Sequence, residues 1–260
     1  MGIYAVTGGT KGIGQQTVTI LRAKGHEVIN IDILNGDITV DLGTVEGRGE
    51  AIAEMHERCP NGLDGLVDNH GIASLQRYKR SYVLAVNYFG AVAVAEGLYD
   101  LLKMKRGKCV VTVSGAIANV KRGKYHVDGL LNNCGDEDRI GRLVDSFPNE
   151  ATPTMYISAK TALANWVRRV SSSWAAHGVN INAVAPGAVA TTIMENTTKN
   201  ADFINIYPMP VLYGTEDFMN AVDVAHALAF LVQPEAKGIN GEIFFCDAGA
   251  NAIANPDKPY

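Results

Sequence analysis

Two tyrosine–lysine pairs in the sequence have a spacing suited to proton transfer, namely Tyr99 with Lys103 and Tyr156 with Lys160. The members of each pair are four residues apart, so a helix would place both side chains on one face. A free tyrosine has a pKa near ~10 and is a poor base at neutral pH. A neighbouring ammonium group favours the phenolate form, which can then remove a proton from a hydroxyl group. A pattern this short also occurs by chance, so the secondary-structure elements around each pair must decide which pair is functional.

A cluster of glycines lies close to the N-terminus, in the stretch "AVTGGTKGIG" at residues 5–14. Between a strand and a helix, glycines permit a tight turn and let the backbone approach a pyrophosphate at the helix N-terminus. The next apolar run ends in Asp32, eighteen residues after Gly14. A carboxylate there can accept hydrogen bonds from an adenosine ribose and would repel a 2′-phosphate. An ordinary turn and a solvated aspartate are the alternatives, but the loop and the acid together favour a dinucleotide site.

Short apolar runs alternate with longer segments of helical periodicity along the chain. Strands are predicted at 3–6, 26–32, 63–67, 108–114, 179–185 and 241–247, and helices at 13–24, 46–58, 82–105, 154–177 and 221–232. This alternation predicts one α/β domain over residues 1–260, a doubly wound parallel sheet of the Rossmann type with helices on both faces. Ligands bind such a sheet at its carboxyl edge, where the helices begin. Tyr156 is near the start of its helix and Tyr99 near the end, so Tyr156 is the candidate base.

The composition is that of a globular protein with a sizeable core, since 47% of the 260 residues are hydrophobic and 19% are charged. The net charge of −4 gives no basic surface for nucleic acid. We expect no membrane span, because no apolar run approaches ~20 residues, and no secretory signal. The four cysteines and six histidines show no metal-ligand spacing, so we expect no metal site and a cytoplasmic protein with reduced thiols.

Two segments do not fit the alternation. Residues 116–152 form an insertion before the Tyr156 helix, far longer than the usual connection of about 2–6 residues. Its mixed charges fit a solvated surface excursion, whereas the helical spacing of "IGRLVDSF" fits a lid or a subunit contact. Residues 191–214 mix apolar and polar side chains and are expected to form a substrate lid, with a core-packing segment as the alternative.

In its motifs the sequence resembles the short-chain dehydrogenase/reductase family over essentially its whole length. The family's T-G-x3-G-x-G pattern is matched by Thr7, Gly8, Gly12 and Gly14, its N-N-A-G by "DNHG" with Asn69 and Gly71, its helix asparagine by Asn87, its Y-x3-K by Tyr156 and Lys160, and its P-G-x-V-x-T by Pro186, Gly187, Val189 and Thr191. The stretches "DLGTVEGRGEAIAE", "DGLV" and "VNYFGA" and the long insertion look like the bacterial 3α-hydroxysteroid dehydrogenase/carbonyl reductase group.

This resemblance implies an NAD(H)-dependent oxidoreductase that interconverts a secondary alcohol and a ketone on an apolar cyclic substrate, such as a 3α-hydroxysteroid. Tyr156 would be the base, Lys160 its activator and the ligand of the nicotinamide ribose. Asn87 would anchor a proton-relaying water, with a local hydrogen bond as the alternative role. The residues expected to contact NAD are Gly8, Thr10, Lys11, Gly12, Ile13, Gly14, Asp32, Asp41, Leu42, Asn69, Gly71, Tyr156, Lys160, Gly187, Val189 and Thr191.

Three positions depart from the family pattern. The family's fifth strand ends in two serines, of which the second polarises the substrate oxygen; here Ser114 takes the first position and Gly115 the second. We predict that Ser114 reaches the site by a local shift of the strand end. Lys11 stands where a basic residue favours NADP, but Asp32 argues for NAD because its carboxylate repels a phosphate more than one flexible lysine attracts it. His70, inside the altered motif, is expected to be packed or solvated rather than catalytic.

Two other functions remain open: a dehydrogenase of aromatic or monoterpenoid alcohols, and a nucleotide-binding regulator with little turnover. Gly115 and the altered "DNHG" support the regulator, whereas the intact pair of Tyr156 and Lys160 speaks against it. The expected partner is a small apolar alcohol or ketone. The family implies a homo-oligomer formed through the fourth and fifth helices, and the insertion near this contact favours a dimer over a tetramer.

Overall fold

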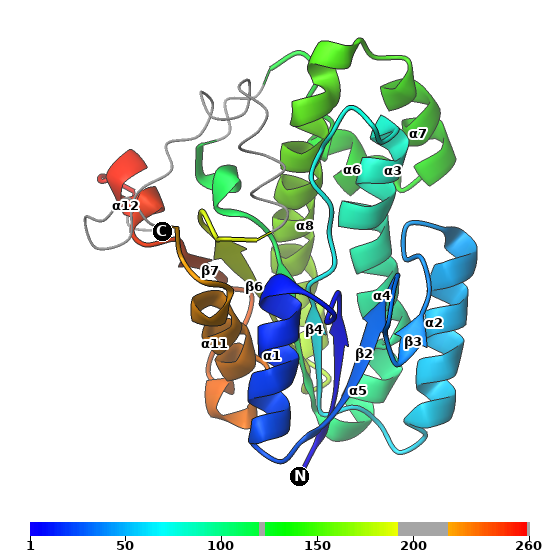
Figure 1. The fold of residues 1–260 in the computed structure, drawn as a ribbon, viewed down its shortest axis with the longest axis vertical. Coiled ribbons are helices and arrows are strands. Elements are labelled where there is room, and N and C mark those ends of the chain that lie inside the picture. Colours follow the sequence, from blue (N-terminus) through cyan, green and yellow to red (C-terminus); the bar gives the residue numbers. More distant parts are fainter. Residues whose placement is uncertain (120–122, 192–217, 259–260) are drawn as a thin grey trace.

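Seven parallel strands form one sheet in the order β3-β2-β1-β4-β5-β6-β7 (Figure 1). The computed structural model describes residues 1–119, 123–191 and 218–258. The strands are β1 (Ile3–Thr7), β2 (Glu27–Asp32), β3 (Ile38–Thr39), β4 (Gly65–Asp68), β5 (Lys108–Thr112), β6 (Asn180–Pro186) and β7 (Ile243–Cys246). The predicted doubly wound sheet is confirmed. Among the strands of the described residues, the edge strand β3 alone has no predicted counterpart, because two residues are too few to form a pattern. The short helix α12 (Ala250–Ala254) was not predicted either.

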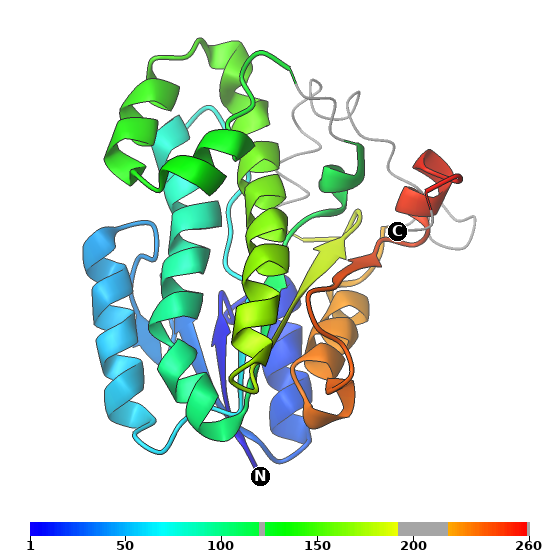
Figure 2. The ribbon, with the colours of Figure 1, turned by 180° about the vertical axis from the view of Figure 1, so that it is seen from behind.

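Helices cover both faces of the sheet (Figures 1 and 2). On one face, α1 (Gly12–Ala23) packs beside α11 (Ala221–Leu231). On the other face lie α2 (Val45–Arg58) and the long α8 (Thr152–Ala175). The same face carries four consecutive helical segments, namely α3 (Arg80–Leu84), η1 (Ala85–Gly90), α4 (Ala91–Gly97) and α5 (Tyr99–Lys105). The single helix predicted at 82–105 is therefore wrong in detail. It contains the π-helical segment η1, and it breaks at Leu98, whose backbone leaves the helical region.

The apolar strands are explained by burial on both faces of the sheet. In β1, Ala5 belongs to the core under α2, α4 and α8, whereas Tyr4 and Val6 belong to the core under α1 and α11. In β5, Val111 belongs to the first of these cores and Val110 to the second. Alternate residues of a strand point to opposite faces, so a strand covered on both sides must be apolar throughout.

The insertion at 116–152 contains two helices, α6 (Asp128–Cys134) and α7 (Glu137–Asp145). The side chain of Asp136 caps α7 by accepting a hydrogen bond from the Arg139 N–H at 2.9 Å. Ile140 and Val144 are buried at the helical spacing visible in the sequence, and α7 packs on α3 while α6 packs on α8. Of the lid predicted at 191–214, residues 192–214 lie outside the described residues.

In the part of the chain that the structure describes, no single helix has the length and apolar character needed to cross a membrane. One bent pair, Arg80–Gly97 with Tyr99–Lys105, meets the criterion by length and composition only. Among the same residues, no group of three or more histidine, cysteine, aspartate or glutamate side chains is placed to hold a metal ion.

Candidate active site

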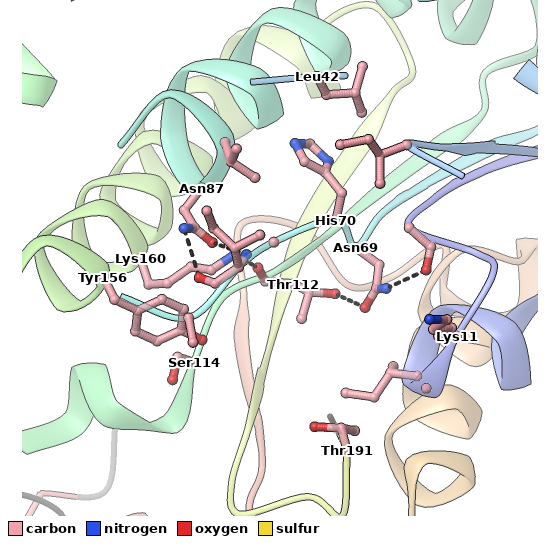
Figure 3. Close-up of a pocket in the computed structure, with 18 of the residues that line it drawn as sticks. Lys11, Leu42, Asn69, His70, Asn87, Thr112, Ser114, Tyr156, Lys160 and Thr191 are labelled. Carbon is pink, nitrogen blue, oxygen red and sulfur yellow. Dashed lines mark hydrogen bonds between the residues drawn. The ribbon is translucent and has the colours of Figure 1, made fainter. Parts of the chain in front are cut away.

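A cavity of about 410 Å³ opens at the carboxyl edge of the sheet (Figure 3). It lies where β1 and β4 stand side by side and the chain leaves them in opposite directions, which is the expected ligand position in a doubly wound sheet. Predicted site residues lining it are Gly8, Thr10, Lys11, Gly12, Ile13, Asp32, Asp41, Leu42, Asn69, Gly71, Asn87, Ser114, Tyr156, Lys160, Gly187, Val189 and Thr191. Gly14 is the one predicted residue that stands behind the cavity wall.

The glycine loop between β1 and α1 has the geometry of an anion site. Gly8 and Gly12 have φ angles of +66° and +55°, a backbone region that disfavours side chains. A Cβ on Gly14 would lie 2.1 Å from the Gly8 carbonyl oxygen, so only glycine lets α1 pack this closely on the loop. The first turn of α1 holds no acidic residue, and no side chain among the described residues caps it at Lys11. Its N–H groups therefore suit a pyrophosphate.

The carboxylate of Asp32 is fixed at the end of β2, beside this loop. Its Oδ2 accepts a hydrogen bond from the Thr10 N–H at 2.9 Å, and its Oδ1 accepts one from the Ile33 N–H at 2.7 Å. Each oxygen keeps further acceptor capacity for the hydroxyls of a ribose. Asn30 holds the same loop, because its Oδ1 accepts a hydrogen bond from the Gly9 N–H at 2.9 Å. Asn30 is not among the predicted site residues, although a buried polar residue inside an apolar strand is a signal for such a role.

The turn that follows β3 lines the cavity beside the end of β2, since the Val40 N–H donates to the Asp32 backbone carbonyl at 3.0 Å. Asp41 Oδ1 accepts a hydrogen bond from the Gly43 N–H at 2.8 Å, and the Tyr82 hydroxyl donates to the same carboxylate at 3.0–3.1 Å. Burial and this hydrogen bond to Asp41 raise the pKa of Tyr82 to about 12. Tyr82 also lines the cavity, a role that its sequence position alone did not indicate.

A chain of hydrogen bonds joins the glycine loop to β5 and α8. The Asn69 side-chain amide donates to the Gly8 carbonyl at 3.4 Å, and Asn69 Oδ1 accepts from the Thr112 hydroxyl at 3.1 Å. The Lys160 ammonium donates to the Thr112 carbonyl oxygen at 2.8 Å. Burial lowers the pKa of Lys160 to about 8, against an opposing effect of the Asp68 charge. Lys160 is thus an ionisable group in the cavity wall, near Asn87 and Tyr156 (Figure 3).

Tyr156 stands one turn before Lys160 in α8 and lies beside Ser114 (Figure 3). Burial raises the pKa of the Tyr156 phenol, and a hydrogen bond with the Ser114 side chain partly offsets this rise. This direction is opposite to the predicted lowering by Lys160, because burial outweighs other effects on the phenol and the ammonium donates to Thr112. Tyr99, by contrast, contacts His177 Nδ1 at 2.8 Å beyond the far end of α8, away from the cavity.

Comparison with known proteins agrees with this geometry. A family model described as enoyl-(acyl carrier protein) reductase matches residues 140–251. The chain is 30% identical over 262 residues to the 3-alpha-hydroxysteroid dehydrogenase/carbonyl reductase of Comamonas testosteroni, covering 99% of this chain and 100% of that protein. The crystal structure of the 3-alpha-hydroxysteroid dehydrogenase from Pseudomonas sp. B-0831 complexed with NADH has a TM-score of 0.89 and 31% identity, covering 98% and 99% of the two chains.

The chain belongs to the short-chain dehydrogenase/reductase family. It is an oxidoreductase that acts on CH–OH groups. More distant members include the coniferyl-alcohol dehydrogenase of Pseudomonas sp., which is 26% identical over 255 residues and for which 94% of each chain is covered.

In this short-chain dehydrogenase/reductase, the side chain of Asn87 is fully engaged by its neighbours. It lies in the π-helical segment η1, a feature often found at functional sites. Its amide donates to the Ile72 and Val83 carbonyls at 3.0 and 2.9 Å, and its Oδ1 accepts from the Ile72 N–H at 3.2 Å. The structure therefore shows the local hydrogen bonds that were the alternative role for Asn87, and the relay of a proton stays a prediction.

The altered "DNHG" motif builds a polar cluster under the glycine loop of this short-chain dehydrogenase/reductase. The Thr7 hydroxyl donates to Asp68 Oδ1 at 2.7 Å, and His70 Nδ1 lies 2.9 Å from Asp68 Oδ1 and 3.0 Å from the Thr7 hydroxyl. The His70 side chain is 9% exposed, and a Cβ on Gly90 would come within 2.9 Å of its Nε2. His70 is thus a packed residue that contacts the glycine loop and also lines the cavity.

The segment after β6 brings the last predicted residues to the glycine loop. A Cβ on Gly187 would lie 2.7 Å from the Asp247 Cα, so only glycine fits at this position. Val189 forms an isolated bridge with Met219. The Thr191 methyl carbon lies 3.5 Å from the position of a Cβ on Gly12, so this segment contacts the glycine loop (Figure 3).

Proposed function

We propose that the protein is an NAD(H)-dependent dehydrogenase that interconverts a secondary alcohol and a ketone on an apolar cyclic substrate, such as a 3α-hydroxysteroid. The observation that carries the proposal is the pairing of the Tyr156 phenol with the Ser114 hydroxyl, one helical turn from Lys160 and at the mouth of a dinucleotide cradle. The relatives named above support the substrate class.

The residues of the cradle fit a dinucleotide from end to end. The glycine loop and the first turn of α1 would hold the pyrophosphate, and Asp32 would bind the hydroxyls of the adenosine ribose. Lys160 has two ammonium hydrogens beyond its bond to Thr112, which suit the hydroxyls of the nicotinamide ribose. When bound, the nicotinamide ring accepts a hydride from an alcohol or gives one to a ketone.

Tyr156 and Ser114 would handle the substrate oxygen. During ketone reduction the Tyr156 hydroxyl gives its proton to the oxygen as the carbonyl carbon receives the hydride, and the Ser114 hydroxyl donates a hydrogen bond to the same oxygen. The raised pKa of Tyr156 keeps the phenol protonated at neutral pH, which suits this direction. Alcohol oxidation is the reverse: the Tyr156 phenolate takes the hydroxyl proton while the Ser114 hydroxyl keeps its hydrogen bond to the substrate oxygen. Ser114 thus compensates for Gly115 from its position two residues beyond β5.

The choice of NAD over NADP rests on Asp32. Its carboxylate is held in place by the N–H groups of Thr10 and Ile33, so it cannot turn away from a 2′-phosphate without losing both hydrogen bonds. The Lys11 side chain is exposed and can adopt many rotamers. Its attraction for a 2′-phosphate is therefore weaker than the repulsion from the fixed carboxylate of Asp32.

We also propose a cytoplasmic homodimer. The insertion helices α6 and α7 pack on α8 and α3, which belong to the two helical regions through which tetrameric relatives are expected to pair. These contacts occupy part of that surface with the chain's own residues.

The test compares the parent with Tyr156→Phe and, as the matched control, Tyr99→Phe from the other tyrosine–lysine pair. NADH formation is followed with a 3α-hydroxysteroid, its 3β epimer, coniferyl alcohol and a monoterpenoid alcohol. We expect turnover of the 3α epimer, a loss of roughly 10²–10⁴-fold in Tyr156→Phe and parental rates in Tyr99→Phe. Preferred turnover of coniferyl alcohol or the monoterpenoid would replace the substrate class. Equal rates in parent and Tyr156→Phe would refute the assignment of the base.

A further inference from the structure

A buried arginine joins the insertion to the body of the protein. Arg48 lies in the first turn of α2, and its side chain is 7% exposed. Its guanidinium group forms a two-point ion pair with Glu137, the first residue of α7, with Nη1–Oε2 at 2.6 Å and Nη2–Oε1 at 2.9 Å. Fixed, two-point pairs of this kind are the strongest that arginine forms with a carboxylate.

The other donors of Arg48 point to backbone carbonyls on the wall of the cavity. Its Nε donates to the Leu42 carbonyl at 2.8 Å, and Nη2 donates to the Ala85 carbonyl at 3.1 Å and the Gly43 carbonyl at 3.4 Å. Leu42 and Gly43 line the cavity, and Ala85 directly precedes two residues of η1 that line it. One side chain thus fixes the turn after β3 relative to η1.

The C-terminal end of α7 holds the same region from a second side. Asp145 accepts hydrogen bonds from the Ser81 N–H at 2.9 Å and from the Ser81 hydroxyl at 2.7 Å. Arg80 Nε donates to the Val144 carbonyl at 3.0 Å. Tyr82 follows Ser81 in α3, and its hydroxyl donates a hydrogen bond to Asp41 in the cavity wall. The N-terminal end of α7 therefore contacts the turn at 41–43 through Arg48, and its C-terminal end contacts the turn through the start of α3.

We infer that Arg48 and Glu137 are positioning residues for the adenosine half of the dinucleotide, and that α7 of the insertion holds the turn at 41–43 of that subsite in place. The inference rests on the proposed function, in which Asp32 binds the adenosine ribose, and on the turn at 41–43, which lines the cavity beside Asp32 and holds the expected NAD contacts Asp41 and Leu42. Removing Glu137 leaves a buried guanidinium group without a counter-charge, and the group must move toward water. The carbonyls of Leu42 and Gly43 then lose a fixed partner, and the turn no longer has one conformation that fits the adenosine.

The test separates the two halves of the cofactor. Dissociation constants for NADH, for ADP-ribose and for reduced nicotinamide mononucleotide are measured by calorimetry on the parent, Glu137→Ala and Arg48→Lys. The lysine variant keeps the positive charge but cannot reach the glutamate and three carbonyls together. We expect both variants to bind NADH and ADP-ribose roughly tenfold more weakly, with the mononucleotide constant and kcat at saturating NADH within about twofold of the parent.

Two control variants match the changes in charge. Asp138→Asn removes one negative charge from the same first turn of α7, as Glu137→Ala does, and Arg58→Lys makes the same arginine-to-lysine change in α2 at an arginine that pairs on the surface with Glu54. Both should bind ADP-ribose as the parent does. Thermal melting shows that each variant is folded, and Glu137→Ala provides the test if Arg48→Lys does not fold.

The outcomes distinguish this inference from the proposed function. Parental ADP-ribose binding in folded Glu137→Ala, or equal weakening for the mononucleotide, overturns the role of the pair. A parent that binds neither NADH nor ADP-ribose overturns the proposed function together with it. A parent that prefers NADPH overturns only the cofactor choice, and the same comparison is then made with 2′-phospho-ADP-ribose.

Discussion

The buried Lys160 ammonium should impose a measurable pH dependence on the stability of the fold. Burial lowers the pKa of Lys160 from 10.5 to about 8. In the unfolded chain the amine binds its proton up to the higher value, whereas in the folded protein it loses the proton at the lower one. Between these pH values the unfolded state holds more protons, so stability increases as the pH rises. Below about pH 8 both states are protonated and the cost of burying the charge is fully present.

The size of the effect follows from the two pKa values. They differ by about 2.5, and each pH unit corresponds to ~1.4 kcal/mol, so the complete change is about 3 kcal/mol. Lys160→Met lacks this titrating group and cannot respond in the same way. The substitution also leaves the Thr112 carbonyl without its donor, but this loss is the same at every pH. The difference in unfolding free energy, parent minus variant, should therefore rise by about 2–3 kcal/mol between pH 7 and pH 10.

Urea unfolding of both proteins at intervals between these pH values measures this difference directly. Lys105→Met, which removes an exposed lysine at the end of α5, corrects for the change in formal charge. A difference between the parent and Lys160→Met that stays constant with pH would show that the ammonium is not buried as the structure places it. A difference that falls as the pH rises would reverse the sign of the reasoning and exclude desolvation as the dominant effect.

Two further predictions concern the proposed chemistry. Ser114→Ala should lower kcat by about 10²–10³-fold with NADH affinity unchanged, because the substrate oxygen loses a hydrogen-bond donor; turnover within about threefold of the parent would remove Ser114 from the mechanism. Asp32→Asn should reduce the ratio of catalytic efficiency with NAD to that with NADP by roughly 10- to 100-fold, since it removes the charge facing a 2′-phosphate. A parent that uses both cofactors with equal efficiency would contradict the role of Asp32.

The sequence was sufficient for the fold and for the glycine loop because both depend on local patterns. Strands such as β1 and β5 are buried on both faces and therefore read as continuous apolar runs. The glycine loop joins such a strand to a helix, and the positive φ angles of Gly8 and Gly12 are the reason that glycine stands there. The same topology distinguishes Tyr156 from Tyr99, since only the start of a helix reaches the carboxyl edge of the sheet.

Features that depend on contacts between distant residues were not predictable. Arg48 and Glu137 are 89 residues apart, and Tyr82 and Asp41 are 41 apart, so no spacing in the sequence relates them. The direction of the Tyr156 pKa shift was also wrong, because the spacing of Tyr156 and Lys160 shows a shared helical face but not the depth of burial of the phenol. Burial is a property of the assembled cavity, and it outweighs the pairwise effect that the motif suggests.

The hydrogen-bond chain from the glycine loop to α8 links the proposed pyrophosphate site to the proposed proton-transfer site across this sheet. Gly8, Asn69, Thr112 and Lys160 are linked in that order, and each link joins the end of one strand or helix to its neighbour. Asn69 uses its amide N–H for the loop and its amide oxygen for β5, which neither aspartate nor leucine can do. Under the proposed function, a dinucleotide bound at the loop would meet Lys160 at a distance that this chain of hydrogen bonds fixes. The strand ends would then set the spacing between hydride transfer and proton transfer.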